Sequence, residues 1–125
     1  MVDYTKMSMC DLGRAIGSGD IDPRDVAAAF LDAAKAHPFS DRIYARFMEA
    51  RAMAEAQAAY ERVQSGVRRG LLDGVPVSWK DLFDTAGVAT EAGSALLKDR
   101  IPTRDAEVLR RASNAGLVAL GKTHM

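Results

Sequence analysis

Apolar residues recur every three or four positions through the N-terminal half of the chain, a spacing that predicts helices. The first predicted helix begins near Met9 and carries Leu12 and Ile16 at helical spacing. It ends at "GSGD", where two glycines provide a flexible exit. One short amphipathic helix is therefore expected at the start of the chain.

Two longer helices are predicted next. "DPRD" is typical of a helix start, because Asp22 can accept hydrogen bonds from unpaired backbone amides and Pro23 needs no donor at the first helical position. This second helix is expected to run to about His37, and "RIYARF" after it favours a short extended piece. The third helix is predicted over residues 48–64, an alanine-rich segment. The side chains at helical spacing in this segment are Met53, Ala56, Tyr60 and Val63.

The C-terminal half has a different pattern. Two glycines and a basic pair in "SGVRRGLLDG" end the helical region, and "VPVSW" at residues 75–79 then predicts a strand. "LVALGK" at residues 117–122 predicts a second strand. Both strands are expected to be buried on both faces, because their apolar residues are nearly continuous.

A fourth helix is predicted between these two strands. Thr103 is a suitable N-cap, Asp105 and Glu107 would lie near the positive end of the helix dipole, and Gly116 would follow the last turn. The residues expected to face inward are Val108 and Ala112.

The order of these elements predicts the fold class. A helix followed by a nearly continuous apolar strand is typical of an α/β sheet with helices on its faces. A chain of 125 residues with 48% hydrophobic content can build one globular domain but not two. We therefore predict a single α/β domain, with a helical N-terminal region at residues 1–66. Residues 67–125 would hold the first strands and helix of a mixed sheet covered by helices.

Charge and cysteine content narrow the partners and the compartment. The 17 basic residues balance the 17 acidic ones, so no net field draws the chain to nucleic acid or to an anionic membrane surface. Small molecules or proteins are the expected partners. The single cysteine, Cys10, excludes an internal disulfide framework, and we expect neither a secretory leader nor a membrane-spanning helix. The expected location is the cytoplasm.

One segment resembles a phosphate-binding loop. "GLVALGKT" at residues 116–123 matches the pattern G-x-x-x-x-G-K-[ST] letter for letter, which favours nucleotide binding. Such a loop follows a strand and opens a helix, whereas here the intervening residues are themselves the predicted strand. A helix, a glycine and a strand ending in Gly-Lys-Thr explain the same letters. Nucleotide binding therefore stays as the weaker alternative.

Metal and thiol chemistry find little support in the sequence. His37 and His124 lie far apart, Cys10 stands alone, and neither a His-Glu-x-x-His motif nor paired cysteines occur. Cys10 is expected to act as a small apolar filler on the first helix, and His37 to compensate the dipole at the end of the second. No serine has a lysine three positions later, which excludes the S-x-x-K class of hydrolase. We expect no metal and no cofactor.

Three blocks of sequence resemble one enzyme family. "GVPVSWKD" at residues 74–81, "TAGVATEAGSALL" at residues 85–97 and "DAEVLRRASNAGLVALGKTHM" at residues 105–125 are similar, in order and spacing, to the N-terminal part of the amidase signature family. The resemblance implies a partial amidase-signature fold. It also implies hydrolysis or transfer of carboxamide C–N bonds by a serine nucleophile, a second serine in a cis peptide and a lysine base. Lys80 occupies the position of that lysine, so the resemblance assigns it to catalysis.

The role of a lysine base can be argued from its charge. A lysine with the usual pKa of about 10.4 is protonated at neutral pH and cannot accept a proton. Burial disfavours the ammonium form, and the apolar neighbours Val75, Val77 and Leu82 are expected to help desolvate Lys80 once the sheet is packed. Asp81 is expected to fix the local backbone by hydrogen bonding, because a carboxylate acting on Lys80 would keep it charged.

The serine segment of the family has no counterpart in this sequence. In the family it is rich in glycine and serine and lies downstream of the Gly-Lys-Thr block, whereas this chain ends at Met125. Ser78 and Ser94 lie near Lys80 but not in such a setting, and we do not expect either to be the nucleophile. The sequence therefore predicts a truncated amidase portion that carries only the lysine and is inactive alone.

The resemblance also bears on partners. It implies a small-molecule amide as substrate, and a second copy of the chain or an amidotransferase-type protein as partner. It does not distinguish a hydrolase from one component of an amidotransferase. Two other function classes stay open on the sequence: a noncatalytic interaction or scaffold module derived from the same fold, and the nucleotide-binding domain.

Overall fold

The structure is a computed structural model that describes residues 2–125. Polar caps set the start of its first two α-helices. Ser8 accepts a hydrogen bond from the Asp11 amide, and Asp22 accepts one from the Arg24 amide. In chain order the elements are η1 (Tyr4–Lys6), α1 (Met9–Ser18), α2 (Pro23–Ala36), α3 (Ser40–Ile43), β1 (Tyr44–Phe47), α4 (Glu49–Gln64), β2 (Pro76–Lys80), η2 (Ala95–Leu97), α5 (Glu107–Asn114) and β3 (Val118–Thr123).

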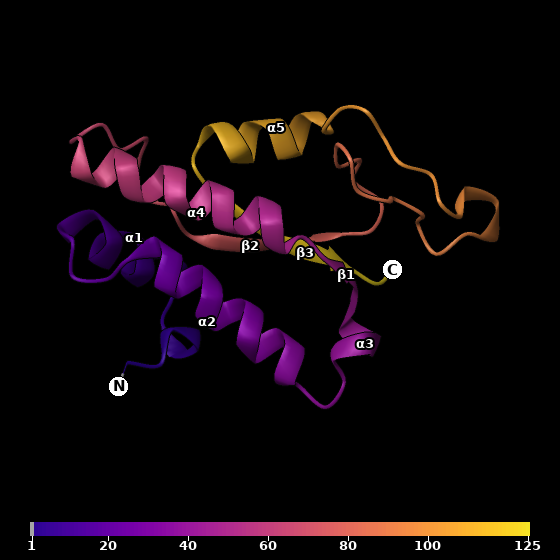
Figure 1. Ribbon diagram of the computed structural model, residues 1–125, viewed down its shortest axis with the longest axis horizontal. Helices are drawn as coiled ribbons and strands as arrows, with labels where there is room; N and C mark the ends of the chain where they lie inside the picture. The colour runs from indigo at the N-terminus through magenta and orange to yellow at the C-terminus, as the bar shows by residue number, and fades with distance from the viewer. Residues whose placement is uncertain (1) are drawn as a thin grey trace.

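A three-stranded mixed sheet lies at the centre of the molecule (Figure 1). β3 is the middle strand, antiparallel to β1 and parallel to β2. In this register Thr123 lies opposite both Tyr44 and Lys80. The mixed sheet with its helices confirms the predicted α/β class. Strand β1 lies within residues 42–47, where "RIYARF" predicted a short extended piece inside the otherwise helical region 1–66, so both halves of the chain contribute to one sheet.

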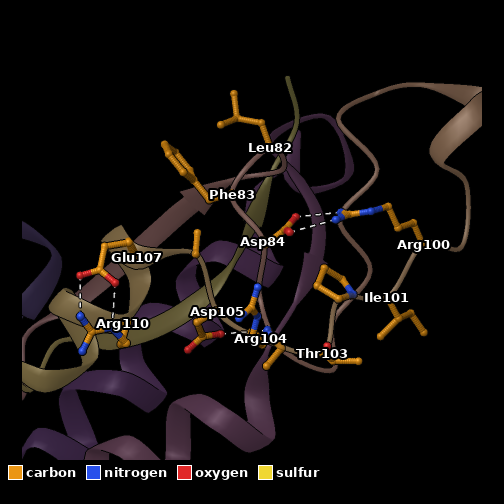
Figure 2. A pocket seen from close by; sticks show the side chains of 13 residues that line it. Leu82, Phe83, Asp84, Arg100, Ile101, Thr103, Arg104, Asp105, Glu107 and Arg110 are labelled. Carbon is orange, nitrogen blue, oxygen red and sulfur yellow. Dashed lines mark hydrogen bonds and ion pairs between the residues drawn. The ribbon is translucent and has the colours of Figure 1, made fainter.

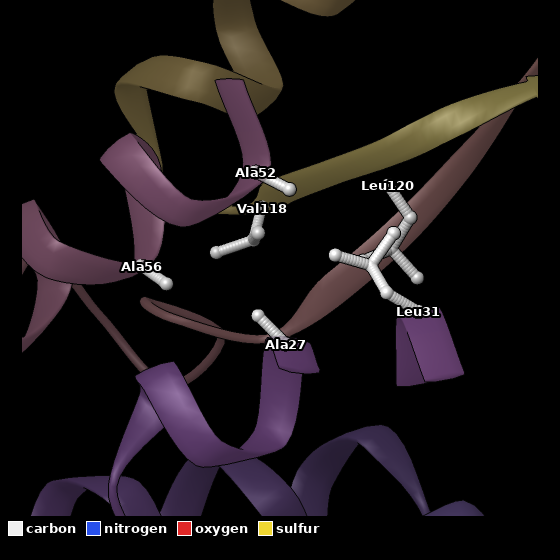
Figure 3. Packing of buried hydrophobic residues seen from close by; sticks show 6 residues of the cluster. All are labelled: Ala27, Leu31, Ala52, Ala56, Val118 and Leu120. Atoms are coloured by element: carbon white, nitrogen blue, oxygen red, sulfur yellow. The ribbon is translucent and has the colours of Figure 1, made fainter. Parts of the chain in front are cut away.

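Two helices pack together against the middle strand. α2 and α4 lie side by side, and side chains of both meet alternate residues of β3 (Figure 3). Alanines on the two helices allow this close approach, because their side chains end at the Cβ atom. The buried members of this cluster are Ala27, Leu31, Ala52, Ala56, Val118 and Leu120. A second buried cluster joins α1 and α2 to the residue that precedes β2, through Leu12, Ile16, Val26 and Val75.

The fourth predicted helix begins later than expected. α5 starts at Glu107 without a side-chain cap, so the prediction of Thr103 as N-cap was wrong. Asp105 precedes the helix and pairs instead with Arg51 of α4, with two nitrogen–oxygen distances of 2.9 Å. It also accepts a hydrogen bond from the Ala86 amide. These contacts hold residue 105 outside the helix.

The side of α5 that faces inward also differs from the prediction. Leu109 is buried, whereas Val108, which was predicted to face inward, is 43% exposed. Ala112 is partly buried. Gly116 follows the C-cap residue with φ +90°, which agrees with its predicted place directly after the helix.

Two predictions about burial were wrong. Cys10 is exposed and does not fill the interior, because α1 buries the face that carries Leu12, Gly13 and Ile16. β2 is only half-buried, although "VPV" predicted a strand covered on both faces. Its position explains the difference, since β2 is an edge strand of the sheet whereas β3 has a neighbour on each side.

The exposed apolar residues predict self-association of the chain. Leu96 is 96% exposed and Ile101 is 60% exposed, both in the long segment that projects from the sheet between β2 and α5 (Figure 1). Together with the edge of β2, they should favour contacts between copies. Light scattering at increasing concentration should therefore show oligomers, and a double substitution of both residues by serine should reduce them. A stable monomer that binds no hydrophobic dye would contradict the expectation.

Candidate active site

Lys80 is the last residue of β2. Its carbonyl accepts hydrogen bonds from the amides of Leu82 and Phe83, with distances of 2.7 and 3.2 Å. These bonds fold the chain into a tight turn directly after the strand. The strand pairing places Lys80 opposite Thr123, so it lies where the carboxyl ends of the parallel strands β2 and β3 meet. Its side chain is exposed.

The predicted apolar cover of Lys80 is only partly present. Val75 is fully buried and Val77 is half-buried, but both lie earlier on β2 or before it. Leu82 is 42% exposed, so it does not enclose the lysine as predicted. The turn that begins after Lys80 carries Leu82 into solvent. Within residues 2–125, the predicted apolar neighbours therefore leave the Lys80 side chain exposed.

The two serines nearest in sequence are engaged elsewhere. The hydroxyl of Ser78 lies 2.6 Å from the hydroxyl of Tyr44 on β1. Ser94 caps η2 by accepting a hydrogen bond from the Leu96 amide. Among residues 2–125 no hydrogen bond joins either serine to Lys80. The structure therefore pairs neither of these two serines with Lys80, and the expectation that neither is the nucleophile stays a prediction.

Asp81 is buried directly beside Lys80. Its carboxylate accepts a hydrogen bond from Arg46 at 2.6 Å, and the same arginine donates to Glu91 at 3.1 Å. Its amide donates to the Thr123 carbonyl and its carbonyl accepts from the Ala92 amide. As predicted, Asp81 fixes the local backbone by hydrogen bonding, and its carboxylate is paired with a cation other than Lys80.

A second lysine, Lys122, lies buried in the same region. Its side chain is 0% exposed, although it follows a glycine on the middle strand of the sheet. The Nζ atom donates to the Phe83 carbonyl and to the Thr90 hydroxyl, both at 2.9 Å, and lies 3.5 Å from an Asp81 oxygen. Lys122 thus joins β3 to the turn after Lys80 and to the long loop that follows.

Burial governs the charge of Lys122. Removal from water lowers the pKa of its ammonium group, and the nearby Asp81 carboxylate acts in the opposite direction. Arg46 and Lys122 supply two positive charges to this cluster, and Asp81 and Glu91 supply two negative ones. The cluster is therefore balanced in charge, which is the condition under which buried ions are tolerated.

The position of Lys122 settles the phosphate-loop alternative. Residues 118–123 form β3, so the letters that match the motif are a strand and not a loop before a helix. The motif is coincidental. Lys122 entered the sequence-based prediction only as part of that motif and of the strand predicted over residues 117–122, and no buried contacts were predicted for its side chain. The available signal was a lysine at the end of a strand predicted to be covered on both faces, because such a lysine needs a buried partner.

The segment between β2 and α5 encloses an open pocket of about 1240 Å³ (Figure 2). Its walls carry several charged side chains, and two pairs of these bind each other across the lining. Asp84 and Arg100 form a double ion pair with distances of 2.8 and 2.9 Å, and Glu107 pairs with Arg110. Lys80 does not line this pocket. The pocket is therefore part of the loop's own packing and not the site around the lysine.

The two histidines, His37 and His124, form hydrogen bonds with nearby backbone groups. The Nδ1 atom of His37 accepts a hydrogen bond from the Phe39 amide, so this histidine shapes the turn after α2. Its predicted compensation of the helix dipole stays a prediction. His124 donates to the Asp41 carbonyl.

Within residues 2–125, no three metal-binding side chains converge on one point. Over the same residues, no helix has the length and apolar character needed to cross a membrane.

Comparisons with known families and curated proteins find amidases and amidotransferase subunits. The family model described as Amidase matches residues 25–125. A glutamyl-tRNA(Gln) amidotransferase subunit from Streptomyces coelicolor is 35% identical over 127 residues, which covers 100% of this chain and 25% of that protein. Its namesake from Myxococcus xanthus is 36% identical over 124 residues, which covers 99% of this chain and 26% of that protein. The chain thus spans about a quarter of the length of the curated relatives it matches.

Solved structures agree with the sequence comparisons. The native peptide amidase from Stenotrophomonas maltophilia superposes with a TM-score of 0.87 at 32% identity, over 96% of this chain and 25% of that chain. A structure described as fatty acid amide hydrolase gives a TM-score of 0.87 at 22% identity, over 96% of this chain and 21% of that chain. At this identity the second likeness concerns the fold alone.

Proposed function

The chain belongs to the amidase family, and from this premise we propose that it provides the lysine base of an active site that hydrolyses or transfers carboxamide bonds. Family membership confirms the resemblance found in three blocks of sequence, and the structural neighbours confirm the partial amidase-signature fold. Amide chemistry is common to the named relatives. The role of Lys80 within that chemistry is the proposal.

The position of Lys80 is the observation that supports this proposal. In sheets with parallel strands, ligands usually bind in the crevice outside the carboxyl ends of the strands. Lys80 lies at such an end, on a backbone held by the turn that follows it. The neighbouring Asp81 carboxylate is occupied by Arg46, so it does not form an ion pair with the lysine. An amine in this setting is available to a group that covers the strand end.

The proposed mechanism follows the resemblance to the family. A neutral Lys80 amine accepts a proton from a bridging serine, which takes a proton from the nucleophilic serine as its oxygen attacks the amide carbon. The amine part of the substrate then leaves with a proton, and water or a second amine cleaves the acyl-enzyme. The ammonium form of Lys80 must first lose its proton, which requires that protein cover the strand end and exclude water.

We propose a carboxamide as the substrate class, in line with the peptide amidase and the amidotransferase subunits that the chain resembles. If ammonia is transferred and not released, the proposal includes an amidotransferase-type partner, because the relatives in question are subunits. A second copy of the chain is the other proposed partner. We also propose that the protein acts in the cytoplasm, where its single cysteine would stay reduced.

The isolated chain of 125 residues is expected to show no amide hydrolysis. Neither Ser78 nor Ser94 contacts Lys80, and both are engaged in other hydrogen bonds, so the chain offers no activated nucleophile. Release of ammonia or of an aromatic amine from simple amides should stay at the level of buffer. Turnover that is lost in Lys80→Ala would contradict this expectation, because it would place a complete site within these residues.

The positive test uses a hybrid enzyme. Residues 1–125 would replace the matching quarter of the Stenotrophomonas maltophilia peptide amidase, with which they share 32% identity and the same backbone. If Lys80 is the base, the hybrid should regain amide hydrolysis, and this activity should depend on Lys80. A hybrid that folds and hydrolyses amides equally well without Lys80 would disprove the proposed function.

A further inference from the structure

Lys122 has no part in the proposed chemistry, yet the chain buries it completely. An ammonium group taken out of water is strongly destabilising unless it is hydrogen-bonded and paired with a carboxylate. The phosphate-loop motif does not explain its presence, because the residues of that motif form β3. The contacts of Lys122 indicate what it does instead.

Those contacts converge on the turn that follows Lys80. The Lys122 ammonium group donates to the carbonyl of Phe83, whose own amide donates to the carbonyl of Lys80. The next residue of β3, Thr123, accepts a hydrogen bond from the Asp81 amide at 2.9 Å. Two adjacent residues of the middle strand therefore hold the turn, one through its side chain and one through its backbone.

The charge balance of the cluster strengthens this hold. Lys122 lies 3.5 Å from the Asp81 carboxylate, which Arg46 of β1 also contacts. Arg46 in turn pairs with Glu91 of the long loop. Elements on both sides of β3 are thus tied to the residue directly after Lys80. Loss of Lys122 would leave two carboxylates with one cation and would remove the ammonium donor of the Phe83 carbonyl, which would keep only the Thr85 hydroxyl as a side-chain donor.

We propose that Lys122 is a positioning residue for Lys80: its buried ammonium group holds the turn after β2 and so fixes the place and direction of the lysine at the strand end. This inference rests on the function proposed for Lys80. Lys122 itself contacts neither substrate nor reacting atoms. It acts through the backbone of residues 81–83.

A spin label at position 80 tests the proposal in the full chain without any need for turnover. Cys10 is exposed and would be replaced by serine, and Lys80→Cys would then carry a thiol-specific nitroxide. In this background the label should give a restricted line shape. Adding Lys122→Met, which keeps the length of the side chain but removes its charge and donors, should shift the spectrum toward the mobile component.

Two matched variants separate positioning from general loosening. Lys98→Met removes a positive charge from the exposed part of the same loop, and Thr90→Val removes one acceptor of Lys122 but leaves its bond to Phe83. Neither should mobilise the label at position 80. A second label on the exposed face of α2, at Ala33→Cys, should be unaffected by Lys122→Met, and circular dichroism should confirm that the variant is folded.

The label spectra decide whether Lys122 positions Lys80. A label that stays restricted in folded Lys122→Met, or that is mobilised equally by Thr90→Val, would overturn the positioning role. If Lys122→Met does not fold, Lys122→Gln, which removes the charge and shortens the reach to Phe83, replaces it with the same expected shift. The proposed function is judged separately in the hybrid enzyme: amide hydrolysis that persists in Lys80→Ala removes that function and leaves the label result standing.

Discussion

Replacing Lys80 by alanine in the hybrid enzyme is expected to lower the acylation rate by about 10² to 10⁴, the usual contribution of a general base. Without the amine, the bridging serine has no group to accept its proton. The fold should be preserved, because the Lys80 side chain is exposed and its hydrogen bonds in the turn are made by the backbone. Single-turnover acylation would be measured beside thermal unfolding of the same variant.

Lys80→Arg is the matched control for this experiment. Arginine keeps the positive charge and much of the length, but it does not give up its proton at any working pH. A lysine that relays protons should not be replaceable by arginine, so this variant should be as slow as Lys80→Ala. Near-normal acylation by the arginine variant would mean that Lys80 acts only through its charge, and the assignment as base would be withdrawn.

Gly116→Ala is expected to cause the largest loss of stability among single substitutions of glycine, about 3 to 5 kcal/mol. Gly116 has φ +90°, a conformation that costs an alanine of the order of 1 to 2 kcal/mol. A Cβ atom there would also overlap the Asp73 carboxylate and approach the Asp73 Cα atom to 3.0 Å. Asp73 cannot yield easily, because it is buried and paired with Arg62. Urea unfolding at low protein concentration would measure the change.

Gly66→Ala separates backbone strain from overlap. Gly66 has φ +70°, but a Cβ atom at this position would meet no atom within 4 Å. It should therefore lose only the strain energy, about 1 kcal/mol. Similar losses for the two variants would show that the contact between Gly116 and Asp73 is not as tight as the structure indicates.

Local signals in the sequence were sufficient for the longer helices. Asp22 and Pro23 define the start of α2, and the alanine-rich spacing of residues 48–64 defines α4 almost to the residue. The start of α5 was missed because it depends on a distant residue. Asp105 looks like part of a first helical turn, but Arg51, far away in the sequence, binds it outside the helix.

The candidate site likewise combines features that local sequence signals predict with contacts between distant residues. Lys80 could be found because the surrounding letters resemble a family motif, and its place at the end of a strand could be inferred from the apolar run before it. The link of Lys122 to Arg46 through Asp81 could not be found from the sequence. Those contacts join β1 and β3 to the residue directly after β2, and the spacing of residues along one strand does not predict the order of strands in a sheet.

The central place of β3 also has a consequence for folding kinetics. β1 and β2 do not pair with each other, and both must wait for a strand that the ribosome makes after them. Until then α2 can associate with α1 and α4, but the surface that will meet Val118 and Leu120 stays open to solvent. Closing such long loops is slow compared with helix formation. The nascent chain should therefore pass through a helical, sheetless intermediate, and this intermediate is the stage at which chaperones would bind it.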